Sequence, residues 1–145
     1  MAALIDTNVL VYCHDPRYLA KQQRARAILR AGADDGTVRL PYQALVEFVS
    51  VVTRPIARGP GLLSPRDARR EAEELLAEFE IVYPNSDVYL TALRGAATYG
   101  MPWFDAHLWA HAECAGLSEL ISEDFAHGRL YGTVRVINPF LDLDS

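Results

Sequence analysis

The sequence is poor in lysine and cysteine and contains no long run of apolar residues. Lys21 is the only lysine among the 14 lysine and arginine residues. The two cysteines, Cys13 and Cys114, lie far apart and lack the CxxC spacing of zinc or redox sites. They are expected to be small buried thiols in a reducing compartment. No apolar run approaches the roughly 18 residues that a membrane-spanning helix needs, so we expect no membrane partner.

The opening residues do not have the pattern of a targeting signal. Residues 1–13 lack a basic region, and Asp6 interrupts their apolar stretch. A cytoplasmic location is therefore the expectation. The length of 145 residues and the 50% share of hydrophobic residues suit one domain, residues 1–145, around one core.

The formal net charge is −5, from 14 basic and 19 acidic residues. Nucleic-acid-binding proteins usually carry a basic footprint, which this total does not suggest. Setting aside the four acids discussed below leaves 14 basic against 15 acidic residues, a net charge of −1. A divalent cation bound by those acids would add positive charge at the same place. The overall charge therefore does not exclude a nucleic-acid partner.

Short apolar runs alternate with longer amphipathic segments along the chain. The short runs predict buried strands at residues 2–5, 37–40, 80–83, 119–122 and 134–137. The longer segments predict helices at residues 7–14, 17–32, 42–53, 65–79, 86–99 and 103–116. Gly32 is predicted to end the second helix. Alternating strands and helices indicate an α/β fold with a parallel sheet covered by helices.

Four acidic residues fall where such a sheet can bring them together. Asp6 directly follows the first strand, and Asp124 lies just beyond the strand at 119–122. Ligands bind outside the carboxyl ends of parallel strands, so both acids are expected at one rim. Glu47 lies in a helix that is otherwise rich in apolar residues, and Asp105 lies in the first turn of another helix.

Carboxylates gathered in this way are suited to a divalent metal ion. Mg²⁺ and Mn²⁺ prefer oxygen ligands, and the four acids would otherwise repel and raise one another's pKa. Such a cation lowers the pKa of a bound water and can direct it at phosphorus. The four acids therefore predict metal-dependent phosphodiester chemistry.

Each acid also has an ordinary structural interpretation. Asp6 and Asp105 could cap helices, Glu47 could pair with Arg54, and Asp124 could be a turn residue. Four aromatic residues could stack on bases: Tyr42, Phe48, Tyr89 and Trp103. Aromatic residues at helical spacing usually belong to the core, so we expect that role for them. The metal-site hypothesis rests on all four acids in one topology.

Four segments of the chain match the short patterns of one enzyme family. In chain order they are IDTNVLVY at 5–12, QALVEF at 43–48 with VTRP at 52–55, WFDA at 103–106, and LISEDF at 120–125 with HG at 127–128. Their order and spacing resemble those of PIN-domain ribonucleases, and the whole pattern is similar to VapC-type toxins of bacterial toxin–antitoxin pairs. The resemblance runs from about residue 4 to about residue 138.

This resemblance implies a fold, a site and partners. The fold is a three-layer α/β/α sandwich with a central, mainly parallel sheet of four or five strands. The activity is endoribonuclease hydrolysis of RNA with Mg²⁺ or Mn²⁺, and the implied partners are a cognate antitoxin protein that blocks the site and a second copy in a homodimer. The implied catalytic and metal-binding acids are Asp6, Glu47, Asp105 and Asp124. The implied auxiliary polar residues are Thr7, Asn8 and Ser122, and Glu123 is a further candidate.

Other protein classes fit less well. A receiver domain needs a lysine after a late strand, whereas Lys21 lies in an early helix. A haloacid-dehalogenase-like phosphatase needs a second acid where Asn8 stands. His107 and His111 have zinc-ligand spacing but lack the glutamate of an HExxH site. A non-catalytic PIN-like scaffold that binds RNA or protein remains the alternative.

Overall fold

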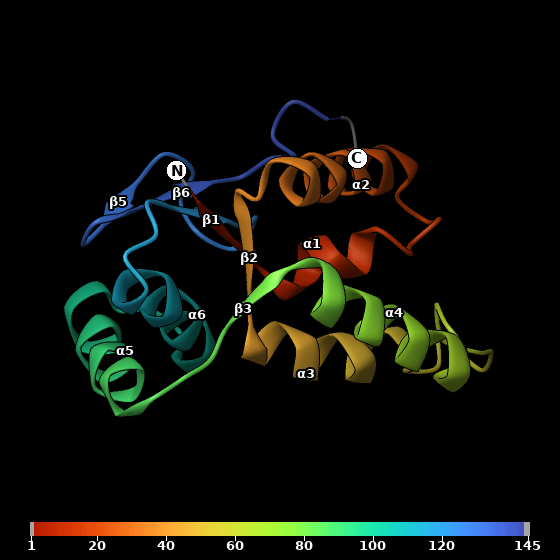
Figure 1. Ribbon diagram of the computed structural model, residues 1–145, viewed down its shortest axis with the longest axis horizontal. Helices are drawn as coiled ribbons and strands as arrows, with labels where there is room; N and C mark the ends of the chain where they lie inside the picture. The colour runs from red at the N-terminus through yellow and green to blue at the C-terminus, as the bar shows by residue number, and fades with distance from the viewer. Residues whose placement is uncertain (1, 144–145) are drawn as a thin grey trace.

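A mainly parallel sheet forms the centre of the computed structural model, which describes residues 2–143 (Figure 1). Its strands are β1 (Ala3–Ile5), β2 (Val38–Pro41), β3 (Glu80–Val82), β4 (Glu119–Ile121), β5 (Leu130–Tyr131) and β6 (Val134–Ile137). They lie in the order β3-β2-β1-β4-β6-β5, and only β5 pairs antiparallel, with β6. The α/β class and the mainly parallel sheet are thus confirmed.

Helices cover both faces of the sheet. They are α1 (Thr7–Tyr12), α2 (Leu19–Asp35), α3 (Tyr42–Val52), α4 (Pro65–Glu78), α5 (Ser86–Tyr99) and α6 (Trp103–Cys114). Helices α1 to α4 lie on one side of the sheet and α5 with α6 on the other (Figure 1). Among residues 2–143, no helix is both long enough and apolar enough to cross a membrane.

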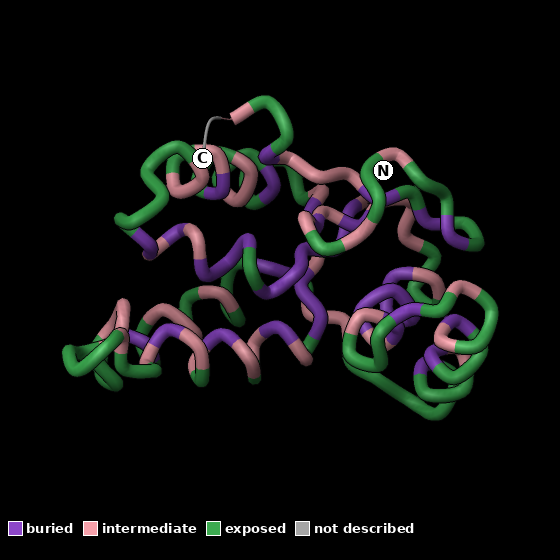
Figure 2. Tube along the Cα trace, turned by 180° about the vertical axis from the view of Figure 1, so that it is seen from behind, coloured by how far each residue is buried: buried purple, intermediate pink, exposed green. Residues whose placement is uncertain are grey.

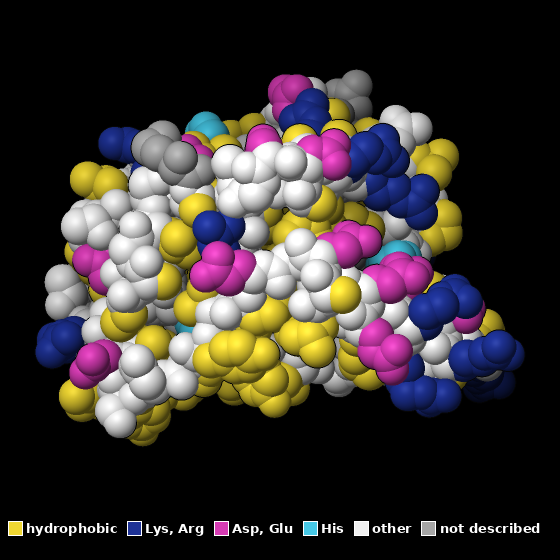
Figure 3. All heavy atoms as spheres, in the orientation of Figure 1, with side chains coloured by type: hydrophobic (Ala, Val, Ile, Leu, Met, Phe, Trp, Pro, Cys, Tyr) yellow, Lys and Arg dark blue, Asp and Glu magenta, His cyan; other side chains and the backbone are white. Residues whose placement is uncertain are grey.

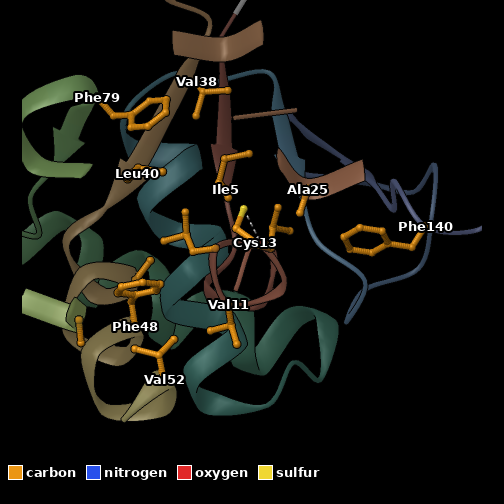
Figure 4. Close-up of a cluster of buried hydrophobic side chains, with 14 residues drawn as sticks. Ile5, Val11, Cys13, Ala25, Val38, Leu40, Phe48, Val52, Phe79 and Phe140 are labelled. Carbon is orange, nitrogen blue, oxygen red and sulfur yellow. Dashed lines mark hydrogen bonds between the residues drawn. The ribbon is translucent and has the colours of Figure 1, made fainter. Parts of the chain in front are cut away.

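Adjacent residues of β1 point into two separate cores, as the alternation of side chains along a strand requires. Ile5 packs in the cluster with α1 to α4, around the fully buried Phe48 (Figure 4). Leu4 packs in the opposite cluster with α5 and α6, beside Trp109. Both faces of β1 are therefore buried, and the middle of the molecule is its most buried part (Figure 2).

The sheet has six strands, one more than the largest number predicted. The additional strand is β5, only two residues long, which folds back on β6 across a turn at Gly132. Two residues give no alternation that could mark a strand in the sequence. The remaining predicted strands are all present, with ends that differ by one residue or none.

The prediction that Gly32 ends a helix is wrong. Helix α2 continues through Asp35 and ends at Gly36, which adopts the left-handed conformation with φ of 70°. Gly32 instead faces β2, and a Cβ atom at this position would lie 2.1 Å from Cγ2 of Val38. The missing side chain therefore allows α2 to pack closely on the sheet.

We expect Gly32→Ala to destabilise the protein. An alanine normally favours a helix over glycine by about 1 kcal/mol. Here the added methyl group overlaps the buried Val38, and overpacking typically costs about 1–3 kcal/mol. The net loss should be about 1 kcal/mol, and at most about 2 kcal/mol, in the free energy of unfolding, measured by urea denaturation.

Val38→Ala supplies the matched background. It removes the Cγ2 atom and leaves the Cβ contact of 2.6 Å, so Gly32→Ala should cost less in that background. An equal cost in both backgrounds would mean that the contact with Val38 is not the cause.

Candidate active site

The carboxyl ends of β1 and β4 lie side by side. Ile5 pairs with Ile121 in parallel register, so the next residues, Asp6 and Ser122, become neighbours at the rim of the sheet. Both are buried, and the Ser122 hydroxyl donates a 2.7 Å hydrogen bond to Oδ2 of Asp6. The predicted adjacency of the two strands thus fixes the first acid of the site.

Asp124 is held over the same rim. Its backbone N–H donates to the Ser122 hydroxyl at 3.1 Å, and Nδ2 of Asn8 donates to its carboxylate at 3.2 Å. Asn8 comes from the first turn of α1, which begins directly after Asp6. The Ser122 hydroxyl therefore bonds to both aspartates: it donates to the Asp6 carboxylate and accepts from the Asp124 backbone N–H.

Glu47 is brought to the site from α3. Its carboxylate accepts hydrogen bonds of 2.9 Å from the Thr7 hydroxyl and from Nε2 of Gln43. Gln43 also donates to the backbone oxygen of Phe104 at 3.4 Å, next to Asp105 on α6. Gln43 was not among the predicted site residues, although its spacing of four residues from Glu47 on one helix is a signal for such a contact.

The pKa values of Asp6 and Asp105 are both shifted by burial and by neighbouring acids. The pKa of Asp6 is raised to about 7, chiefly by burial; the Ser122 hydrogen bond lowers this pKa, and the negative charge of Asp124 raises it. Burial also raises the pKa of Asp105, with smaller contributions from the negative charges of Asp124 and Glu47. The charge of Asp124 therefore reaches both Asp6 and Asp105, and the charge of Glu47 reaches Asp105.

The ordinary structural interpretations do not account for Asp6, Asp105 or Glu47, whereas Asp124 does lie in a bend after β4. Asp6 occupies the N-cap position of α1, but its side chain makes no capping hydrogen bond. Asp105 lies inside a helix whose N-cap is Pro102. Within residues 2–143, none of the four acids forms an ion pair, and Glu47 is bonded to neutral donors rather than to Arg54.

Glu123 differs from its neighbour Asp124. Its carboxylate lies 3.0 Å from Nζ of Lys21 and also accepts a hydrogen bond from the Tyr12 hydroxyl. The Lys21 amine also donates a hydrogen bond of 3.2 Å to the Tyr12 hydroxyl oxygen. Glu123 is thus neutralised by the sole lysine and anchors the loop that carries Asp124.

The donor set fits a divalent cation. As the side chains stand, no group of three or more His, Cys, Asp or Glu residues in the described chain is close enough to hold a metal together. Mg²⁺ commonly uses only one or two carboxylates and keeps several waters, so this spacing suits it. Hard carboxylate oxygens without a cationic partner are the ligands that such an ion prefers.

Two hollows differ in their relation to the acids. One of about 580 Å³ is lined by residues of α2 and α4 and includes none of the four acids. The other, of about 460 Å³, is lined by Gln43 and Glu47 of α3 together with residues of α6. Among the aromatic residues expected in the core, Phe48 is buried, but the others are exposed: Tyr42, Tyr89 and Trp103.

Comparisons with known proteins agree with this architecture. The family model described as PIN domain matches residues 3–132. A toxin–antitoxin complex from Klebsiella pneumoniae contains a similar chain, with 20% identity, a TM-score of 0.66, and coverage of 95% of this chain and 98% of that one. Mycobacterium tuberculosis VapC20, described as a sarcin–ricin loop cleaving toxin, has 15% identity, a TM-score of 0.66, and coverage of 85% and 90%. FitAcB from Neisseria gonorrhoeae has 20% identity, a TM-score of 0.62, and coverage of 96% and 99%. A comparison with curated proteins finds no match.

The raised pKa of Asp6 predicts a pH-dependent stability. The unfolded chain loses this proton near its ordinary value of 3.8, whereas the folded protein keeps it until about pH 7. Between these values the folded state binds more protons, so the free energy of unfolding should fall as pH rises, by at most about 1.4 kcal/mol per pH unit. Asp6→Asn should flatten this fall, measured by urea denaturation of metal-free protein from pH 4 to 8.

Asp34→Asn is the control, because Asp34 is an exposed acid near the end of α2. It should leave the pH dependence of wild type unchanged. A wild-type profile that stays flat through this range would contradict the burial of an ionisable Asp6.

Proposed function

The chain belongs to the PIN-domain family, and we propose that it is a metal-dependent endoribonuclease that hydrolyses RNA phosphodiester bonds. The observation that carries this proposal is a set of four acids that no cation offsets among residues 2–143, with neutral donors orienting the carboxylates of Asp6, Glu47 and Asp124. A non-catalytic scaffold would have no use for this costly arrangement.

Asp6, Glu47, Asp105 and Asp124 would hold Mg²⁺, or Mn²⁺ in its place, one or two of them directly and the others through waters bound to the ion. The cation supplies a water of lowered pKa and charge stabilisation at the phosphate. Ser122 and Asn8 fix the two rim aspartates, and Thr7 with Gln43 fixes Glu47. Because burial makes Asp6 hold a proton near neutral pH, cation binding would displace that proton.

The similar structures support RNA as substrate and an antitoxin as partner. One is described as cleaving the sarcin–ricin loop, and others are toxin–antitoxin complexes. We therefore propose that this chain is the toxin of such a pair, that it acts in the cytoplasm as a homodimer, and that its antitoxin covers the acids.

Cleavage of total RNA by the purified protein tests the nuclease. Cuts should appear with Mg²⁺ or Mn²⁺ and disappear with EDTA. Loss of outer partners of metal ligands typically reduces activity about 10–100-fold, which is the effect expected for Ser122→Ala. Asp6→Asn should lose more, and Asp34→Asn should match wild type. If wild type and Asp6→Asn give the same products in every condition, the proposed activity is wrong.

Thermal unfolding tests the metal site without relying on activity. At a Mg²⁺ concentration one hundred times the dissociation constant, binding should stabilise the folded protein by about 2.7 kcal/mol. The midpoint of wild type and of Asp34→Asn should rise on adding Mg²⁺ at pH 8. The midpoint of Asp6→Asn should rise much less; equal shifts would place the cation elsewhere.

Co-expression tests the toxin assignment separately. A small reading frame next to this gene should encode a protein that copurifies with the chain and suppresses RNA cleavage. If it does neither while the purified chain still cuts RNA, the nuclease proposal stands and the toxin proposal does not.

A further inference from the structure

Beyond β6 the chain continues as a C-terminal segment, residues 138–143, that crosses α1 and α2 and belongs to no helix or strand. Arg24 of α2 fastens it: the guanidinium donates to the backbone oxygen of Pro139 at 2.5 Å and pairs with the Asp142 carboxylate at 3.0 Å. Figure 3 shows an acidic and a basic side chain side by side where the segment crosses α2. The C-terminal segment is therefore held to α2 at two points.

Phe140 is the buried anchor of the C-terminal segment, with 4% of its surface exposed. Its ring meets the Tyr12 ring of α1 edge-on, with centroids 5.1 Å apart. The Lys21 amine lies 5.6 Å from the centre of the Phe140 ring. Figure 4 shows Phe140 at the edge of the core cluster that α1 to α4 share. Phe140 thus packs on the two side chains that bond to Glu123.

The start of the C-terminal segment and the end of β6 bond to both ends of the loop at residues 122–128, which carries the fourth acid. At the beginning of this loop, the Ser122 N–H donates to the backbone oxygen of Ile137 at 3.0 Å. Near its end, Nδ1 of His127 accepts a hydrogen bond of 2.9 Å from the Asn138 N–H. The loop is therefore fixed at both ends by the part of the chain that leads into the C-terminal segment.

The surroundings of Lys21 restrict its amine to one place. The amine lies 4.9 Å from the centre of the Tyr12 ring and 5.7 Å from that of Tyr18, with the Phe140 ring as the third wall. Aromatic faces attract a cation at such distances. Removing the Phe140 ring would admit water to this enclosure, and an ion pair weakens when water reaches it. The bond between Lys21 and Glu123 therefore depends on Phe140.

We infer that the C-terminal segment is a positioning element of the candidate active site, with Phe140 as its positioning residue. Phe140 packs on Tyr12 and Lys21 and keeps both in place. These two side chains hold Glu123, whose backbone continues directly into Asp124 through a rigid peptide plane. The segment thereby sets where the Asp124 carboxylate lies. This inference rests on the proposed function, because Asp124 is one of the acids that would hold the cation.

Hydrogen exchange of the metal-free protein, followed by mass spectrometry, tests whether the segment holds the loop. The Asp124 N–H is bonded to the Ser122 hydroxyl, so its exchange reports local opening of the loop. Phe140→Ala should speed exchange in peptides covering residues 122–128. Peptides of α5, which packs in the opposite core, should exchange as in wild type.

Binding of Mn²⁺ tests whether the position of the loop matters to the cation. Free Mn²⁺ gives an electron paramagnetic resonance signal that is lost on binding, so its dissociation constant can be measured without RNA. Phe140→Ala should raise this constant about tenfold, the lower end of the effect of losing outer partners of metal ligands. A residue that only stabilised the fold would leave the constant unchanged in protein that circular dichroism shows to be folded.

Leu141→Ala is the matched control, because Leu141 is the next residue of the same segment and is 61% exposed. It should match wild type in exchange and in Mn²⁺ binding. A second pair of variants decides the question if Phe140→Ala does not fold. Lys21→Met removes the charge and should weaken Mn²⁺ binding, whereas Lys21→Arg keeps a cation for Glu123 and should retain most of the affinity.

The outcomes separate this inference from the proposed function. If Mn²⁺ binds wild type and Phe140→Ala equally well, the inference is overturned and the metal site stands, whether or not the loop exchanges faster. If loop and α5 peptides quicken together, Phe140 acts through overall stability and the inference is again overturned. If only the loop quickens in Phe140→Ala while wild type binds no Mn²⁺, the segment does hold the loop and the proposed metal-dependent function fails.

Discussion

The parallel pairing of β1 with β4 is the constraint on which the candidate site depends. Its register places Asp6 beside Ser122 in the first residues beyond the strands, where the chain must leave the sheet. Both faces of β1 are packed against helices, so this strand cannot shift without exposing one of two cores. The position of the rim acids is therefore set by the burial of Leu4 and Ile5, which contact none of the chemistry.

Helix α1, which follows β1 directly, contacts two of the other acids, Glu47 and Asp124. Its first two residues point to different partners, Thr7 to Glu47 and Asn8 to Asp124. A short helix that starts directly after a buried strand has no freedom to change this distribution. Neutral donors, and not arginines, therefore bond to the carboxylates of Asp6, Glu47 and Asp124, although arginine is abundant in the chain.

Residue order along the chain was sufficient to predict the class of fold and the placement of Asp6 and Asp124 at one rim, because strand ends are local signals. It was insufficient wherever contacts across the molecule decide the outcome. Gly32 looks like a helix terminator in sequence and is a packing surface for β2 in the structure. Asp124 and Glu123 are adjacent acids, yet only the structure shows that Lys21 neutralises one of them. The exposure of Trp103 likewise depends on how α6 faces α3.

The engagement of Lys21 has a practical consequence for chemical labelling. The only lysine side chain is tied to Tyr12 and Glu123, beside the loop that carries Asp124. Reagents that acylate amines therefore have just two kinds of target, the chain's amino terminus and this ion pair. A dye or bead coupled through Lys21 would remove the charge that holds Glu123 and would disturb the loop of Asp124. Of the two cysteines expected to be buried, only Cys13 is; Cys114 is exposed. Surfaces and fluorophores for this protein are better attached through the thiol of Cys114, which lies at the far end of α6 from Asp105.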